Sequence, residues 1–224
     1  FVTALLNNLN FISPKTYYVP TTFNDQEVTY LFQEKITKEL LESYRLREGP
    51  ILEGDERFLW REDTDEAFDR LNLARLVNRQ WADKGLTGLN ISEEALHMMN
   101  KAYLEYLLGM HYYKSRNERF LNSSFLGNKN ELATKKNQEF QALLVALHAP
   151  HGLRPHNRVF YFDAMYKYFL PIYYDGSSNV LSNKIVTLAD LNKDEIIGSN
   201  YALASIQDLD KDKFINQLKI LGVN

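Results

Sequence analysis

The sequence of 224 residues contains no cysteine, 6 prolines and 10 glycines. Without cysteine the chain can form no disulfide, no cysteine-ligated zinc site and no thiol nucleophile. It also lacks a run of about 18 apolar residues, the length from which a membrane-spanning helix is inferred. The first ten residues contain no basic residue of the kind that begins a secretory signal peptide. We therefore expect no membrane insertion.

An excess of positive charge is absent too. Lysine and arginine number 26 against 29 acidic residues, which gives a net charge of −3. Since nucleic-acid-binding proteins need a concentrated positive field, we expect no nucleic-acid partner. The hydrophobic share of 45% and the charged share of 25% are typical of a globular protein with its own core.

Three motifs that would identify a reaction class do not occur in the sequence. There is no G-x-S-x-G, so a serine-hydrolase nucleophile elbow is excluded. Neither G-x-G-x-x-G nor G-x-x-x-x-G-K-[ST] is present, so the Rossmann and Walker phosphate cradles are excluded as well.

The first 46 residues predict a short helix, a β-hairpin and a second helix. Proline follows serine at Pro14 and ends the first helix, and a β-branched and aromatic run then favours a strand. Alternating residues after an Asn-Asp turn predict the partner strand. The predicted elements are the helix Thr3–Leu9, the strands Thr16–Phe23 and Val28–Ile36, and the helix Lys38–Leu46.

The middle of the chain predicts mostly helix. We expect a strand at Arg57–Trp60 and a helix that begins near Thr64, carries apolar residues as far as Trp81, and is ended by Gly85 and Gly88. Ser92 is predicted to cap a further helix, and Asn130 to begin one that ends at Leu147. Between these two helices the polar stretch Lys114–Lys136 is predicted to be a linker.

Reactive side chains are most concentrated at His148–Asn157. The prolines in this stretch exclude a helix, so a loop is predicted. Strands are predicted to follow at Arg158–Phe162 and Tyr168–Tyr174, and a last amphipathic helix at Asp208–Leu221. Three of the five histidines lie in this loop, which raises a zinc site and a metal-dependent hydrolase as one alternative. The spacing does not match a hydrolytic zinc motif, because the histidines lie on a loop broken by prolines and no carboxylate lies between His148 and Asp163.

A helix, a loop with an asparagine, a hairpin and a final aspartate form the layout in which kinase-fold enzymes hold magnesium. Asn157 supplies the amide and Asp175 the carboxylate, and both would reach the oxygens of a triphosphate. The early hairpin fits this layout, because it would place Glu34, Lys35 and Ile36 against an adenine ring.

Two stretches carry a family resemblance. In the first, Tyr30, Glu34 and Ile36 fit a Y-x-x-x-E-x-I strand; the second begins at His156-Asn157 and ends in F-L-P-I-Y-Y-D at Asp175. These stretches resemble the CotH kinase-like family, atypical protein kinases named for spore-coat protein H, with HipA-like kinases as the neighbouring family.

The resemblance implies an α+β, protein-kinase-like fold in a single domain, 1–224. A truncated N-lobe and hinge would occupy 1–51, and a mainly helical C-lobe would occupy 52–224. It implies ATP and Mg²⁺ as cofactors, Asp175 and Asn157 as metal ligands, and phosphoryl transfer to a protein or other hydroxyl acceptor. The family's members are secreted or associated with the cell surface, and they carry a basic strand upstream, so we expect Phe1 not to be the native start.

The sequence lacks the catalytic aspartate of the family pattern, and this departure raises the question of whether the domain transfers phosphate. The family's catalytic aspartate precedes the asparagine by a few residues, and kinase spacing puts that position at Gly152. No acidic residue lies between Glu139 and Asp163. Either His151 or His148 acts as the base, since histidine exchanges protons near neutral pH, or the domain is a pseudokinase that binds or assembles. A helical scaffold without a site is a further alternative.

Arg154 lies in the same loop, and two roles are open for its guanidinium. It would either grip a phosphate oxygen as part of the cofactor site or pair with a neighbouring acid.

Overall fold

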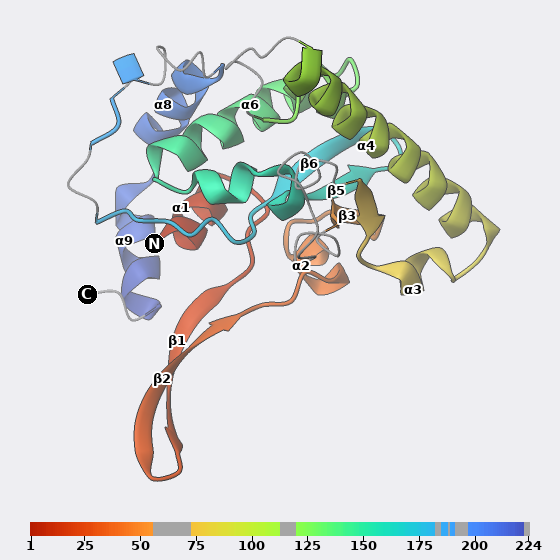
Figure 1. Cartoon of the computed structure of the whole chain (residues 1–224). Coiled ribbons are helices and arrows are strands. Elements are labelled where there is room, and N and C mark those ends of the chain that lie inside the picture. Colours follow the sequence, from red (N-terminus) through yellow and green to blue (C-terminus); the bar gives the residue numbers. More distant parts are fainter. Residues whose placement is uncertain (56–72, 113–119, 182–184, 188, 191–196, 222–224) are drawn as a thin grey trace.

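The computed structural model describes residues 1–55, 73–112, 120–181, 185–187, 189–190 and 197–221, with the side chains of 109–112 left aside. Helices and small antiparallel sheets are mixed along the chain, as Figure 1 shows, so the α+β class is confirmed. Among the described residues no helix is long and apolar enough to span a bilayer.

A four-stranded antiparallel sheet forms the centre of the molecule, in the order β4-β3-β5-β6. The strands are β3 (Ile51–Gly54), β4 (Ala74–Leu76), β5 (Val159–Asp163) and β6 (Tyr168–Ile172). The β5–β6 hairpin confirms the two strands predicted on either side of the turn at 163–167. β3 was not predicted, and it contains both Ile51 and Leu52, so the expected boundary between the lobes falls inside a strand.

Both faces of β5 are buried, which explains its nearly continuous apolar sequence. Phe160 and Phe162 pack with Tyr103 of α4 (Leu86–Tyr112). Val159 and Tyr161 pack on the opposite face, with Leu41 of α2 (Lys38–Ser43).

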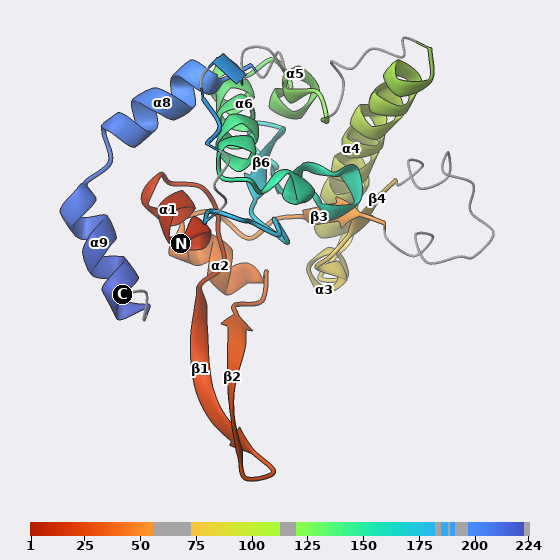
Figure 2. The same ribbon diagram turned by 60° about the vertical axis from the view of Figure 1, so that its left-hand side comes forward.

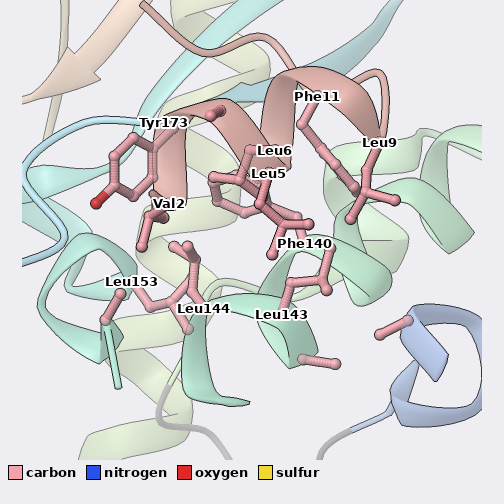
Figure 3. Close-up of a cluster of buried hydrophobic side chains, with 14 of the residues drawn as sticks. Val2, Leu5, Leu6, Leu9, Phe11, Phe140, Leu143, Leu144, Leu153 and Tyr173 are labelled. Carbon is pink, nitrogen blue, oxygen red and sulfur yellow. The ribbon is translucent and has the colours of Figure 1, made fainter. Parts of the chain in front are cut away.

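A third apolar cluster joins the two ends of the chain to α6 (Glu131–Ala146). Figure 3 shows α1 (Val2–Asn8) lying against the side chains of α6, with Leu5 and Leu6 facing Leu143 and Leu144. The side chain of Asn130 accepts a hydrogen bond from the backbone N–H of Ala133, so the predicted cap of this helix is confirmed.

The C-terminal helices α8 (Ser199–Gln207) and α9 (Lys211–Ile220) pack beside α6 and α1. At the start of the chain, the ring of Phe1 contacts that of Phe214 edge to face, with their centroids 5.5 Å apart.

A second sheet consists of the hairpin β1 (Thr16–Phe23) and β2 (Gln26–Gln33). Asn24 and Asp25 form its turn with φ of 49° and 58°, the left-handed values that a two-residue hairpin turn requires. The prediction of this hairpin is confirmed. Figures 1 and 2 show it projecting away from the rest of the molecule.

The helix predicted to continue as far as Trp81 is wrong where the structure describes it. Ala74–Leu76 is β4, paired with β3, and only Arg79–Ala82 is helical, as α3. Pairing with β3 decides the strand, and no periodicity within the segment shows it. The strand predicted at Arg57–Trp60 and the cap predicted at Thr64 lie outside the described residues.

The glycines and the serine that follow were also misassigned. Gly85 and Gly88 do not end a helix, because α4 begins at Leu86. Gly88 lies inside α4 where a Cβ would come within 2.9 Å of the backbone oxygen of Trp81, so it allows α3 and α4 to approach closely. Ser92 does not cap the helix, since its hydroxyl donates to the Gly88 carbonyl one turn earlier.

The predicted linker 114–136 contains a helix, α5 (Ser123–Gly127), and the beginning of α6. Asn122 caps α5 by accepting a hydrogen bond from the N–H of Ser124. Residues 113–119 of that stretch lie outside the described part.

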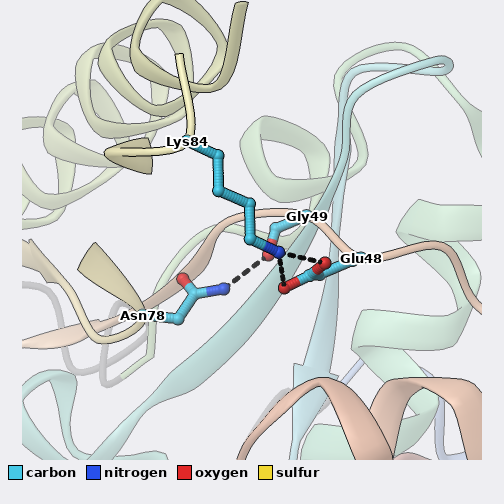
Figure 4. Close-up of polar contacts among 4 residues, drawn as sticks. All are labelled: Glu48, Gly49, Asn78 and Lys84. Atoms are coloured by element: carbon cyan, nitrogen blue, oxygen red, sulfur yellow. Dashed lines mark hydrogen bonds and ion pairs between the residues drawn. The ribbon is translucent and has the colours of Figure 1, made fainter. Parts of the chain in front are cut away.

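Polar contacts tie the segment before β3 to α3, as Figure 4 shows. Asn78 donates to the carbonyl of Gly49 and accepts from the N–H of Ile51, each at 2.8 Å. Lys84 donates to both carboxylate oxygens of Glu48. These contacts fix the entry into β3, the strand that borders β5.

Candidate functional site

The loop between α6 and β5 makes two single 3-10 turns, η3 (Pro150–Leu153) and η4 (Pro155–Asn157). A proline begins each turn, where its missing N–H leaves no hydrogen bond unmade. Gly152 and Leu153 are buried, so the loop is packed into the molecule along part of its length. The predicted end of the helix before this loop is confirmed.

The structure brings together the three residues that the sequence predicts to be catalytic. His151 Nε2 lies 3.4 Å from Asp175 Oδ2, and the side-chain amide of Asn157 donates to the backbone oxygen of His151 at 3.1 Å. Asn157 is 3% exposed, whereas the side chain of Asp175 is 52% exposed. The buried Asn157 therefore fixes the backbone of the loop at His151, and the carboxylate of Asp175 is accessible to solvent.

Gly152 brings the loop into backbone contact with the turn after β6. A Cβ at this position would lie 2.9 Å from the carbonyl oxygen of Tyr174 and 3.2 Å from the Cα of Gly176. The first distance is shorter than real Cβ contacts, so no side chain fits here without a shift of backbone. An aspartate at position 152, where the resemblance would place one, has no room, and His151 is the neighbouring side chain that faces Asp175.

The turn that carries Asp175 is held in an unusual conformation. Asp175 and Ser177 have φ of 34° and 45°, left-handed values that aspartate tolerates better than most residues. Gly176 packs against the ring and hydroxyl of Tyr173, where a Cβ would meet the hydroxyl at 2.5 Å. Burial raises the pKa of the Tyr173 phenol, so this hydroxyl stays neutral beside the carboxylate.

A pocket of about 340 Å³ opens beside Asp175. One side is polar and comprises Asp175, Ser177 and Ser178; the other is the base of the β1–β2 hairpin, with Tyr18 and Leu31. None of the described residues that line it is a lysine or arginine. The pocket therefore joins a carboxylate and hydroxyls to an apolar wall.

The residues predicted to contact adenine do not line this pocket. Glu34 closes the base of the hairpin: its carboxylate accepts from the N–H of Lys15 at 3.0 Å, and its own N–H donates to the Lys15 carbonyl. Ile36 packs against the apolar cluster of Leu40 and Ile51. Lys35 is exposed. Gln33, one residue earlier, does line the pocket.

Arg154 is exposed at the junction of the two turns. Its predicted grip on a phosphate, like the adenine contacts of Glu34, Lys35 and Ile36, stays a prediction.

Sequence reasoning missed Arg158, the residue after Asn157. Its side chain is 1% exposed and lies over the ring of Phe160 at 4.5 Å, a cation–π contact. Burial lowers its pKa to about 10. Among the described residues, no group hydrogen-bonds to its three guanidinium nitrogens. Its position at the start of a predicted strand gave no sign of this burial.

Sequence reasoning also missed the pocket hydroxyls and aromatic rings. Ser177 and Ser178 directly follow Asp175-Gly176, and that adjacency was an available signal. The contribution of Tyr17 and Tyr18 depends on how the hairpin sits against α1, which the sequence pattern does not encode.

The donor set suits magnesium better than zinc. Within the described residues no three His, Cys, Asp or Glu side chains are grouped closely enough to hold a metal, although the rings of His151 and His156 lie 6.2 Å apart. Zinc sites need three or four such protein ligands. Magnesium takes as few as one or two protein oxygens together with phosphate and water, and the exposed carboxylate of Asp175 is a donor of this kind.

No protein-family model matches the chain, and no curated protein matches it.

Proposed function

We propose that this chain is a CotH-like kinase domain that binds ATP with Mg²⁺ and transfers a phosphoryl group to a hydroxyl of a protein or other acceptor. The observation that carries the proposal is the contact between His151 and Asp175 at the edge of the pocket, with Asn157 bound to the same loop. A general base and a metal-binding carboxylate are the two groups that such a transfer needs close together.

Asp175 and Asn157 would hold the magnesium ion, which neutralises charge on the phosphate oxygens when it is bound. The exposed carboxylate of Asp175 is accessible to a cation. The amide nitrogen of Asn157 already donates to His151, so its oxygen Oδ1 is the end left to act as a ligand. Because the described lining of the pocket contributes no lysine or arginine, the metal has a larger share in balancing the triphosphate.

His151 would accept the proton of the attacking hydroxyl. Its imidazole is partly exposed, with 35% of the side chain accessible, so an acceptor can reach it. Its backbone oxygen is fixed by Asn157 and the adjacent Gly152 is fixed against Tyr174, which together hold the ring beside Asp175. A positioned base of this kind contributes typically 10²–10⁴-fold to a rate.

The hairpin side of the pocket would receive the nucleoside. Tyr17, Tyr18 and Leu31 offer apolar and aromatic surface of the kind on which a planar base packs. Ser177 and Ser178 offer hydroxyls to the ribose or the phosphates from the opposite side.

A pseudokinase is the second candidate, and the absent carboxylate at the base position favours it. In that case the domain would bind the nucleotide as a binding or assembly module and transfer nothing.

The experiment is thermal unfolding of the 224-residue chain with ATP, in the presence and absence of Mg²⁺. We expect a magnesium-dependent rise in Tm for wild type, because a ligand that binds the folded state stabilises it. Asp175→Ala should lose the rise. Asp163→Ala is the matched control: it removes an aspartate at the far end of the same hairpin, where the carboxylate accepts from the N–H of Met165, and it should keep the rise.

A labelled-phosphate assay then separates the two candidates. Transfer by wild type that falls by about 10²–10⁴-fold in His151→Ala supports the kinase. A magnesium-dependent rise in Tm without transfer selects the pseudokinase, and no rise in wild type contradicts both.

A further inference from the structure

One face of the β1–β2 hairpin is apolar and open to solvent. The register pairs Tyr17 with Phe32 and Val19 with Tyr30, so these four side chains share a face. Phe23 and Val28 extend the same face toward the turn. Tyr30 and Phe32 are 51% and 48% exposed and Phe23 is 61% exposed. Such a face on a soluble protein marks an interaction surface, and a lone two-stranded hairpin is marginally stable in water.

The two edges of the hairpin differ. Hydrogen-bonded and non-hydrogen-bonded pairs alternate along it, and the bond from the Glu34 N–H to the Lys15 carbonyl fixes which pairs are which. Pro20 falls in a non-hydrogen-bonded pair, so the outer edge of β1 lacks a donor at its centre. β2 has no proline, and its outward N–H and C=O groups are those of Glu27, Thr29, Leu31 and Gln33.

The outer edge of β2 is self-complementary. In an antiparallel pairing with a second β2 about a two-fold axis at Tyr30, Val28 lies opposite Phe32 and Tyr30 opposite itself, so the apolar face continues across the junction. The same register brings Asp25 opposite Lys35, and Glu27 opposite the neutral Gln33. No like charges oppose each other.

We propose that two copies of this chain associate through β2, forming a four-stranded antiparallel sheet in the order β1-β2-β2-β1. Among the described residues no third strand occupies this edge. Figures 1 and 2 show the hairpin projecting away from the rest of the molecule. The two-fold axis would put the two bodies at opposite ends of the shared sheet.

The dimer is expected to be weak and reversible. In this register Glu27 to Gln33 of each strand face each other, 7 residues or about 24 Å of edge at roughly 3.4 Å per residue. An interface formed by one strand edge is expected to bury less than the roughly 800 Å² per partner of a standard stable interface. Main-chain hydrogen bonds therefore supply much of the affinity of the dimer.

Cross-linking tests the register directly, because the chain has no cysteine of its own. Tyr30 lies opposite its copy in a non-hydrogen-bonded pair, with Cα atoms about 4.5 Å apart, which is within disulfide range. Tyr30→Cys should therefore form disulfide dimers under mild oxidation. Val19→Cys is the matched control, since it lies on the same face at the opposite edge, and it should stay monomeric. Equal cross-linking of both variants, or none in Tyr30→Cys, overturns the proposal.

Sedimentation of the cysteine-free protein tests the association itself. Wild type should shift toward dimer as its concentration rises, and Thr29→Pro should remain monomeric because it removes an outward N–H of β2. Thr22→Pro removes the equivalent group of β1 and should leave the dimer intact. Lys35→Asp should weaken the dimer, and Asp25→Lys combined with Lys35→Asp should restore it. Wild type that stays monomeric at every concentration contradicts the proposal.

Discussion

The two hairpins of this molecule contain the same kinds of residue, but the aromatic side chains of one are buried and those of the other are exposed. In β5–β6 the rings of Phe160, Phe162 and Phe169 are 1% exposed or less, whereas in β1–β2 Tyr18 and Phe23 are 62% and 61% exposed. The difference lies in the neighbouring elements, since β3, α4 and α6 pack against the first hairpin and no described element covers the tip of the second. A buried hairpin gives Asp175 a rigid support, and an exposed one offers surface.

The largest expected effect is the difference in the free energy of unfolding that is lost when a phenylalanine of each hairpin is replaced by alanine. Phe162→Ala should lower the free energy of unfolding by about 3–5 kcal/mol, because it leaves a cavity between the sheet and α4. Phe23→Ala, the matched change on the exposed hairpin, should stay within about 0.5 kcal/mol. Urea denaturation measures both, and equal losses would show that the exposed hairpin is part of the core.

A smaller effect tests the close approach at the site. Gly152→Ala should cost about 1–3 kcal/mol, since its Cβ has no room beside Tyr174, and should also reduce nucleotide binding. Asp25→Gly in the turn of the exposed hairpin is the control, because glycine adopts its left-handed φ of 58° without strain. It should leave both unfolding and nucleotide binding nearly unchanged. Wild-type stability and binding in Gly152→Ala would contradict the packing of the loop.

Tyrosines with raised pKa values make the free energy of unfolding depend on pH in the alkaline range. Burial raises the pKa of Tyr44 and Tyr161 to about 12, above the ordinary value near 10. The folded state therefore keeps protons that the unfolded state loses, so their contribution is complete below pH 10 and is lost as pH rises to about 12.

Arg158 opposes this trend, because its folded pKa of about 10 lies below that of the unfolded state and stability rises with pH in the same window. Burial also raises the pKa of Tyr103, Tyr168 and Tyr173 and lowers that of Lys136, so five tyrosines outweigh Arg158 and Lys136. We expect a net fall in the free energy of unfolding between about pH 10 and 12. Denaturation curves across this range measure it, and Tyr161→Phe should flatten the slope. A net rise would contradict the assigned burial.

The smallest expected effect concerns the helix that leads into the site. Asn130→Ala should cost about 1 kcal/mol, because it removes the acceptor for the N–H of Ala133 at the start of α6. Thermal unfolding measures the loss. A loss above that of Gly152→Ala would reverse the expected order.

Local patterns predicted the parts of the fold that local chemistry decides. The first hairpin follows from alternating residues after a turn signal, the second from two apolar and aromatic runs around a turn, and the start of α6 from Asn130. β3 could not be predicted, because four residues form a strand there only through pairing with β4 and β5. The continuation to Trp81 failed for the same reason, since β4 is defined by its partner.

In the candidate site, too, some residues could be predicted from the sequence and others depend on contacts between distant segments. The order of Asn157 and Asp175 along the chain, together with the family resemblance, predicts a site that they share, and folding brings His151 into contact with each of them. The pocket beside them depends on where the exposed hairpin meets Ser177 and Ser178, a contact between distant segments. The burial of Arg158 between aromatic rings is likewise set by packing.

The most direct test of the central claim locates the cation. Mn²⁺, added with ATP as a paramagnetic substitute for Mg²⁺, broadens NMR signals of groups near its binding site, and the five histidine rings supply natural probes. The account predicts that the His151 ring signal broadens first, because Nε2 lies 3.4 Å from the Asp175 carboxylate, and that Asp175→Ala abolishes this selectivity. Broadening of His97, exposed on α4, as early as that of His151 would contradict the claim that Asp175 binds the metal.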